Sequence, residues 1–228
     1  RDRGVPVNVD ASLIADRYHR LAERVRDLGG DRVRIVAVTK TFPIEAVRAV
    51  RAAGCDRIGE NYAQELVTKF GTWNETDGER PEVHFIGGLQ TNKVRSLVGL
   101  VDLWQTVDRR SLLDEIARRA PGSRVLIQVN ATDEDTKSGC RVDEVDALVE
   151  TAIARGLRVD GLMTIGPTRP DSALTRRAFR MVSAAANRLG LAEVSMGMSG
   201  DWEIAIDEGS TLIRVGSAIF GDRPPHAS

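Results

Sequence analysis

Short apolar runs alternate with amphipathic segments along almost the whole chain. Eight of these runs are rich in Val, Ile and Leu, as parallel strands buried on both faces are. The expected strands are Val33–Thr39, Arg57–Gly59, Val83–Gly87, Leu103–Val107, Val125–Asn130, Val159–Ile165, Val194–Met196 and Leu212–Val215.

In the segments between these runs, apolar residues recur every three or four positions, which predicts amphipathic helices. The expected helices are Ile44–Ala53, Tyr62–Phe70, Asn92–Val98, Arg110–Ala120, Val142–Arg155, Ser172–Leu189 and Trp202–Glu208. One further helix comes first in the chain, with apolar positions from Leu13 to Leu28, and Gly29-Gly30 ends it.

This order of elements predicts a single (β/α)8 TIM barrel, in the α/β class, that spans residues 1–228. No low-complexity stretch or long linker divides the chain. The first helix is expected to cover the gap left because little chain follows the last strand. A doubly wound open sheet is the alternative, but no Gly-x-Gly-x-x-Gly follows the first strand. The barrel is therefore the favoured fold.

The composition excludes several classes of protein. The 228 residues include 32 basic and 33 acidic ones, without the basic excess of a nucleic-acid-binding domain. No apolar run approaches the ~20 residues of a membrane span, and the first residues lack the apolar core of a signal peptide. We therefore expect a cytoplasmic protein. Two cysteines, Cys55 and Cys140, and three dispersed histidines indicate neither a disulfide framework nor a metal centre.

Lys40 is the most unusual polar residue, because it directly follows the apolar run Arg34–Thr39. Lysine is among the residues least often buried. Its position alone favours a salt bridge or a side chain that reaches back to water. The alternative is an amine that forms a Schiff base with a carbonyl compound. The other strand ends decide between these two interpretations.

In a barrel of this type the active site lies at the carboxyl ends of the strands. Polar or glycine-rich sequence lies at the end of each predicted strand or directly after it, so a ligand site is expected on this face. The segments are Lys40, Gly59–Asn61, Gly87–Lys93, Asp108, Asn130, Met163–Thr164, Ser195–Ser199 and Arg214–Ser217.

Two neighbouring segments predict a phosphate site. Small residues from Ser195 to Asp201 lead into the helix that begins near Trp202, where backbone N–H groups can approach an anion. Gly216 and Ser217 close the last strand, and loops after strands seven and eight of barrels frequently bind phosphate. Routine helix capping by Ser199 and a tight turn at Gly216 are the alternative. The pairing of the two loops favours phosphate on Ser199, Gly216 and Ser217.

Arg214 lies within an otherwise apolar strand, so its guanidinium needs a partner. A carboxylate, Glu60 or Asp207, is one candidate, and a ligand acceptor such as a ring nitrogen is the other. An amine, a phosphate cradle and an arginine together indicate pyridoxal 5′-phosphate. Arginine only donates hydrogen bonds. It would therefore leave the pyridine nitrogen unprotonated, which suits mild chemistry or none.

Seven segments of the chain match the sequence pattern of one known family. They are Ala37–Thr41, Gly59–Glu65, His84–Lys93, Lys137–Gly139, Gly161–Met163, Ser195–Ser199 and Ile213–Gly221. Through these segments the chain resembles the pyridoxal phosphate homeostasis protein family. The resemblance implies a fold similar to the N-terminal barrel of alanine racemase and a role in vitamin B6 balance without established catalysis.

The resemblance also implies roles for residues of this chain. Lys40 would bind the cofactor, Asn61 would lie by its ring and Arg214 would face the pyridine nitrogen. Ser199, Gly216 and Ser217 would hold the phosphate, and Met163 completes the expected cofactor contacts. The chain departs from the family at Gly88, where a proline is usual, and at Gly200–Trp202.

Three functions are compatible with these features. The favoured one is a non-catalytic carrier of pyridoxal phosphate, a monomer or weak dimer that passes the cofactor to apo-enzymes. The second is an amino-acid racemase, which needs an acid/base group on each face of the substrate. Lys40 could be one, but alanine racemase takes its tyrosine from a second domain, which we expect to be absent here. The third is a regulatory protein whose state follows cofactor occupancy.

The remaining polar residues are assigned structural roles. Tyr18 belongs to the apolar stripe of the first helix. Tyr62 is expected to pack at a helix start, with an approach to the cofactor site as the alternative. His84 is expected to support the loop after the third strand without taking part in chemistry. Lys137–Gly139 is expected to be a solvated loop, with contact to a ligand or partner as the alternative.

Overall fold

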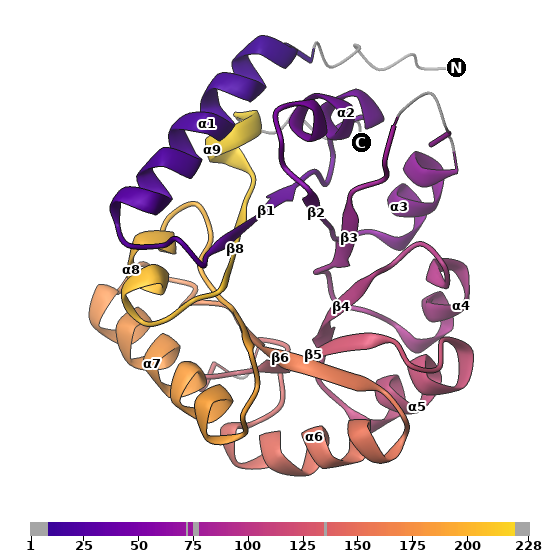
Figure 1. The fold of residues 1–228 in the computed structure, drawn as a ribbon. Coiled ribbons are helices and arrows are strands. Elements are labelled where there is room, and N and C mark those ends of the chain that lie inside the picture. Colours follow the sequence, from indigo (N-terminus) through magenta and orange to yellow (C-terminus); the bar gives the residue numbers. More distant parts are fainter. Residues whose placement is uncertain (1–8, 72, 75–77, 135, 222–228) are drawn as a thin grey trace.

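The computed structural model describes residues 9–71, 73–74, 78–134 and 136–221, and in it eight parallel strands close into a barrel (Figure 1). Each strand pairs with its neighbour in sequence, and β1 pairs with β8 to complete the ring. The strands are β1 (Arg34–Val38), β2 (Arg57–Glu60), β3 (Glu82–Phe85), β4 (Leu103–Val107), β5 (Arg124–Val129), β6 (Arg158–Thr164), β7 (Glu193–Ser195) and β8 (Leu212–Val215). The predicted barrel is confirmed.

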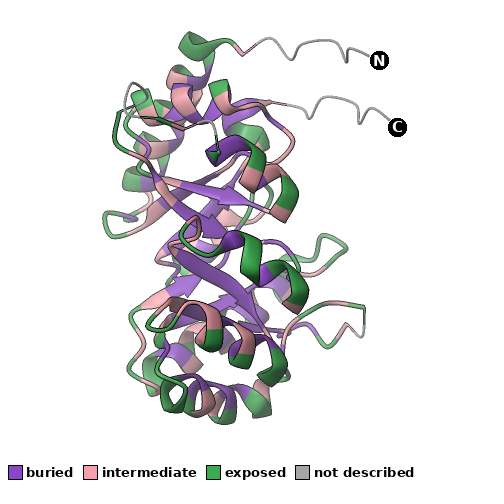
Figure 2. Cartoon of the chain, turned by 90° about the vertical axis from the view of Figure 1, so that its right-hand side faces the viewer, coloured by how far each residue is buried: buried purple, intermediate pink, exposed green. Residues whose placement is uncertain are grey.

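Helices surround the strands, with exposed outer faces and buried inner ones (Figure 2). They are α1 (Ala11–Asp27), α2 (Ile44–Ala52), α3 (Ala63–Phe70), α4 (Val94–Leu97), α5 (Arg110–Arg119), α6 (Val145–Ala154), α7 (Ser172–Arg188), α8 (Trp202–Asp207) and α9 (Ser217–Phe220). Two 3-10 turns, η2 (Thr91–Lys93) and η3 (Val142–Glu144), precede α4 and α6.

The predicted strand ends are correct to within two residues. The sequence pattern misses two kinds of detail. The first turns of two expected helices are 3-10 turns, as is common at helix termini. The four-residue helix α9 was not predicted, since it is too short to show helical periodicity.

The first helix packs where it was expected to. Asp10 caps α1 by accepting a hydrogen bond from the Leu13 backbone N–H at 3.0 Å, and Ile14, Leu21 and Val25 form the buried stripe. The helix lies against α2 and the short α9 (Figure 1). It therefore covers the side of the barrel where the four-residue α9 follows the last strand.

Alternate residues of the strands point into and out of the barrel. Ile35 and Ala37 of β1 belong to the core shared with the helices. Val36 faces the other way, into a separate buried cluster with Leu103, Leu126, Met163 and Leu212. This apolar cluster forms one layer of the barrel interior, so the barrel is a packed core and not a channel.

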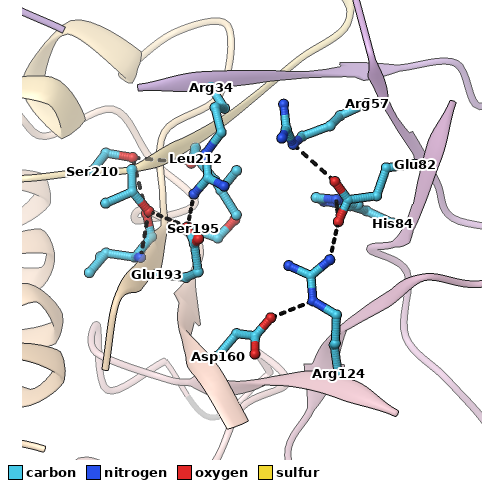
Figure 3. A network of polar contacts seen from close by, with 12 residues as sticks. Arg34, Arg57, Glu82, His84, Arg124, Asp160, Glu193, Ser195, Ser210 and Leu212 are labelled. Carbon is cyan, nitrogen blue, oxygen red and sulfur yellow. Dashed lines mark hydrogen bonds and ion pairs between the residues drawn. The ribbon is translucent and has the colours of Figure 1, made fainter. Parts of the chain in front are cut away.

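Charged residues gather at the amino ends of the strands (Figure 3). Glu82 at the start of β3 pairs with Arg57 and with Arg124, and Arg124 also pairs with Asp160. Arg34 pairs with Glu193 at the start of β7. The two ends of the barrel therefore differ: ion pairs close the amino end, and the loops form the carboxyl end.

Candidate functional site

A cavity of about 380 Å³ opens at the carboxyl end of the barrel. All seven residues expected to bind a cofactor line it, although they come from distant parts of the chain. They are Lys40, Asn61, Met163, Ser199, Arg214, Gly216 and Ser217. The structure therefore brings the sequence-predicted site together at the predicted face.

The backbone on both sides of Lys40 is fixed by hydrogen bonds to side chains of α3. The carbonyl oxygen of Thr39 accepts a hydrogen bond from Lys69 Nζ at 2.7 Å. The N–H of Thr41 donates to the Glu65 carboxylate at 2.6 Å. Thr41 also adopts a left-handed backbone, with φ of 68°, which is uncommon for a residue other than glycine. These contacts hold the segment that carries the amine in one conformation.

The side chains that hold this segment form a buried ion cluster below it. Lys69 Nζ lies 2.7 Å from the Glu60 carboxylate and 2.6 Å from the Glu65 carboxylate. Thr39 Oγ1 donates to the same Glu60 oxygen at 2.6 Å. Burial raises the pKa of Glu60, while the Lys69 charge and the Thr39 hydroxyl act against this rise. Sequence reasoning missed this cluster, although the four-residue spacing of Glu65 and Lys69 on one helix is a visible signal.

Arg214 is buried, and none of the described carboxylates accepts a hydrogen bond from its guanidinium. Its Nη1 donates to Ser195 Oγ at 2.6 Å and its Nη2 to the Thr164 carbonyl at 2.8 Å. The expectation of Glu60 or Asp207 as a possible partner is wrong, because each is paired with another cation. Burial lowers the pKa of Arg214 to about 10. The two bonds use two of five N–H groups, and the side chain lines the cavity.

The loop after β7 presents backbone donors to the cavity. Within the described ranges, the N–H groups of Ser199 and Gly200 donate no hydrogen bond to the protein. Ser199 does not cap α8, since Asp201 occupies the N-cap position and its carboxylate accepts the Met198 N–H at 2.6 Å. The capping alternative for Ser199 is therefore wrong, and the donors stay available to an anion.

The loop after β8 approaches the cavity from the other side. Gly216 has φ of −115°, so the tight turn proposed for it does not need a left-handed backbone. The glycine is favoured for a different reason, because a Cβ there would come within 3.3 Å of the Val38 carbonyl oxygen. Ser217 starts α9, where the first N–H groups of a helix have no partner within the helix.

Known proteins match this chain over nearly its whole length. Residues 9–224 match the family described as alanine racemase, N-terminal domain. The pyridoxal phosphate homeostasis protein of Aquifex aeolicus is 37% identical over 223 residues, which cover 93% of this chain and 96% of that protein. The protein of the same name from Escherichia coli is 38% identical over 206 residues, 85% of this chain and 87% of that one. The chain belongs to the pyridoxal phosphate homeostasis protein family.

Solved structures agree with this family assignment. The structure of PipY from Synechococcus elongatus with PLP bound has a TM-score of 0.81 and 32% identity. The match covers 91% of this chain and all of PipY. Alanine racemase of Corynebacterium glutamicum, at 18% identity and a TM-score of 0.72, shares the fold. That match covers 97% of this chain and 64% of the racemase chain.

A second cavity of about 180 Å³ adjoins the first and shares Asn61 with it. In this member of the homeostasis protein family, Lys137 and Ser138 line the second cavity. Lys137 pairs with Glu134 and donates to the Gly166 carbonyl at 2.5 Å, so its side chain is only 16% exposed. The expectation of a solvated loop is therefore wrong for Lys137, whose charge is held by the protein.

His84 and the tyrosines of this family member lie outside the main cavity. His84 is buried in β3 and contacts Gln105 of β4, whereas Thr106 holds the next loop by donating to the Gly87 carbonyl at 2.7 Å. The expected support of that loop by His84 is not seen. Tyr18 packs against the core as expected. Tyr62 is 49% exposed, so its expected packing role is wrong.

No group of three or more His, Cys, Asp or Glu side chains among the described residues could hold a metal ion. None of their helices is long and apolar enough to span a membrane.

Proposed function

We propose that this chain binds pyridoxal 5′-phosphate at Lys40 and serves vitamin B6 homeostasis as a non-catalytic carrier in the cytoplasm. The observation that carries this proposal is the single cavity lined by Lys40, Arg214, Ser199, Gly216 and Ser217. The names of the relatives and the PLP bound to PipY support the same cofactor.

The donors around the cavity fit this cofactor. Pyridoxal phosphate supplies an aldehyde that condenses with amines, a pyridine ring and a phosphate. Lys40 offers the amine. The open N–H groups of Ser199 and Gly200, together with Ser217 at the start of α9, suit the phosphate. Arg214 offers donors to the pyridine nitrogen, and Asn61 and Met163 would flank the ring.

The set of titratable groups favours a carrier over a racemase. Racemisation needs an acid/base group on each side of the substrate carbon. Of the described residues that line the main cavity, only Lys40 and Arg214 carry ionisable side chains. Arginine stays charged, so Lys40 alone could exchange a proton there. The racemase is kept as the second candidate because the chain shares the fold of alanine racemase.

The first experiment locates the cofactor. The sequence contains four lysines, Lys40, Lys69, Lys93 and Lys137, so borohydride trapping followed by peptide mass spectrometry can test each of them. We expect pyridoxal phosphate to be trapped at Lys40 in the wild type and in Lys93→Ala, the control. We expect no adduct at this position in Lys40→Ala. Absence of a wild-type adduct at Lys40 would overturn the proposal.

The second experiment separates carrier from enzyme. Loaded protein is mixed with an apo-enzyme that needs pyridoxal phosphate, and the recovery of activity is compared with release into a small-molecule trap. Transfer faster than free release supports direct delivery to the apo-enzyme. Racemisation of an amino-acid panel that disappears in Lys40→Ala would instead favour the racemase.

A further inference from the structure

A continuous chain of polar side chains crosses the barrel interior and ends at Arg214. Arg214 Nη1 lies 2.6 Å from Ser195 Oγ, and Ser195 Oγ lies 2.7 Å from Gln105 Oε1. Gln105 Nε2 lies 2.6 Å from Nδ1 of His84. The ring Nε2 of His84 lies 3.3 Å from the Glu82 carboxylate. Four strands, β8, β7, β4 and β3, therefore contribute to one path from the cavity toward the amino end.

The chemistry of Arg214 fixes the direction of every donation between Arg214 and His84. Arg214 can only donate. Ser195 therefore accepts from Arg214 and gives its own hydrogen to the amide oxygen of Gln105. The Gln105 amide nitrogen then donates to Nδ1 of His84, which leaves the ring hydrogen on Nε2, facing Glu82. If the donor and acceptor groups of Ser195, Gln105 or His84 alone were exchanged, two donors or two acceptors would face each other.

The far end of the chain is anchored by charge. Arg57 Nε lies 3.1 Å from the Glu82 carboxylate, and Arg124 pairs with the same carboxylate (Figure 3). Glu82 therefore stays in place beside Nε2 of His84, a buried nitrogen that makes no hydrogen bond to any described residue. Burial lowers the pKa of His84, which favours the neutral ring that the chain requires.

Ser195 is the only described side chain that holds the guanidinium of Arg214. Its second bond goes to a backbone carbonyl, that of Thr164. The Thr164 carbonyl belongs to the backbone of β6, which its sheet partners hold in place. Of the two acceptors of Arg214, only the Ser195 hydroxyl can therefore change its position. The orientation of Ser195 is set in turn by Gln105 and His84.

We propose that Ser195, Gln105 and His84 are positioning residues that aim Arg214 at the ring of the bound cofactor. This inference rests on the proposed binding of pyridoxal phosphate. None of the three lines the main cavity, so they act through Arg214.

Ser195→Ala tests the chain, because the change removes both the acceptor for Arg214 and the donor to Gln105. The control is Ser210→Ala, which removes a buried hydroxyl nearby that donates to the carbonyls of Met196 and Leu212. The measurements on the full chain loaded with pyridoxal phosphate are the absorption and fluorescence spectra of the bound cofactor, its dissociation rate and the thermal midpoint.

We expect Ser195→Ala to release pyridoxal phosphate at least about tenfold faster, as for the loss of a hydrogen bond to a charged group. Its bound spectrum should shift in the same direction as that of Arg214→Gln. Ser210→Ala should keep the wild-type spectrum and release rate even if its thermal midpoint falls. If Ser195 had only a structural role, Ser195→Ala would lower the thermal midpoint without shifting the spectrum of the bound cofactor.

A double-mutant cycle shows whether the effect passes through Arg214. In Arg214→Gln, the added change Ser195→Ala should have no further effect on the spectrum or release rate. At the next member, His84→Asn keeps an acceptor near the place of Nδ1 and should resemble the wild type. His84→Leu removes this acceptor and should resemble Ser195→Ala.

The outcomes separate this inference from the proposed function. Trapping at Lys40 with wild-type spectra and release rates in Ser195→Ala would overturn the positioning chain and leave the cofactor site intact. Fully additive effects of Ser195→Ala and Arg214→Gln would also overturn it. If the wild type traps no cofactor at Lys40, both proposals fail together.

Discussion

At the residue scale, Lys40 is held through its neighbours by the cluster of Lys69, Glu60 and Glu65. A lysine amine on a flexible stem loses considerable rotamer freedom on ordering. Fixing the backbone on both sides reduces the number of conformations from which the amine must reach the cavity. The cluster is therefore a structural support for the proposed attachment site.

Lys69→Met should destabilise the fold strongly. Removal of one partner of a buried ion pair typically costs about 3–5 kcal/mol, since it leaves an uncompensated charge. Here it would leave the buried Glu60 and the nearby Glu65 facing each other. The measurement is the free energy of unfolding from urea titration. Lys93→Met is the control and should change it by less than about 0.5 kcal/mol.

The double variant Lys69→Met with Glu60→Gln separates charge from packing. It should recover part of the lost stability, because it removes the buried carboxylate charge together with its partner. Equal stability of Lys69→Met and wild type would show that the cluster contributes nothing to the fold.

At the element scale, Gly161 and Gly88 both lie in segments through which the chain resembles its family, but they differ in the space around them. Gly161 lies in β6 where this strand pairs with β7, and a Cβ there would come within 1.9 Å of the Glu193 carbonyl oxygen. Gly88 lies in the loop after β3, and a Cβ there would meet nothing within 4 Å. Strand pairing therefore excludes a Cβ at Gly161, whereas the loop has room for one at Gly88.

Gly161→Ala should therefore be destabilised by at least about 2 kcal/mol, as expected for overpacking against a rigid backbone. Gly88→Ala is the matched control and should stay within about 0.5 kcal/mol of the wild type. Thermal and urea unfolding of both variants measure the difference. Similar stability of the two variants would contradict the close approach of β6 and β7.

At the scale of the whole molecule, the ion pairs at the amino end make stability depend on pH. Contact with His84 and the charges of Arg124 and Arg57 lower the pKa of Glu82 to about 2. A carboxylate whose pKa is lower in the folded state stabilises the fold above its unfolded pKa, near 4.5. This contribution is lost as the pH falls from about 4.5 toward 2.

Glu82→Gln should remove this pH dependence. Between pH 4.5 and 2, the unfolding free energy of the wild type should fall by up to about 3 kcal/mol more than that of the variant. Glu150→Gln, at an exposed position of α6, is the control and should keep the wild-type slope. Parallel pH profiles of wild type and Glu82→Gln would contradict the assignment.

The sequence predicts those features that depend on local pattern. The strands are found because Val, Ile and Leu runs between amphipathic segments are distinctive, and the site follows because parallel strands bring their carboxyl ends together. The side-chain partner of Arg214 was missed, since Arg214 meets Ser195, and Ser195 meets Gln105, only through the inward alternation of separate strands. The burial of Lys137 was missed because its partner carbonyl at Gly166 is 29 residues away.

The packed layer of Val36, Leu103, Leu126 and Leu212 lies on the amino-end side of the main cavity, which opens at the carboxyl end of the barrel. In the carrier that we propose, loading and delivery would both use this end of the barrel. A protein that receives the cofactor directly would cover the opening while the cofactor passes, so a cavity in the act of delivery could not be refilled at the same time.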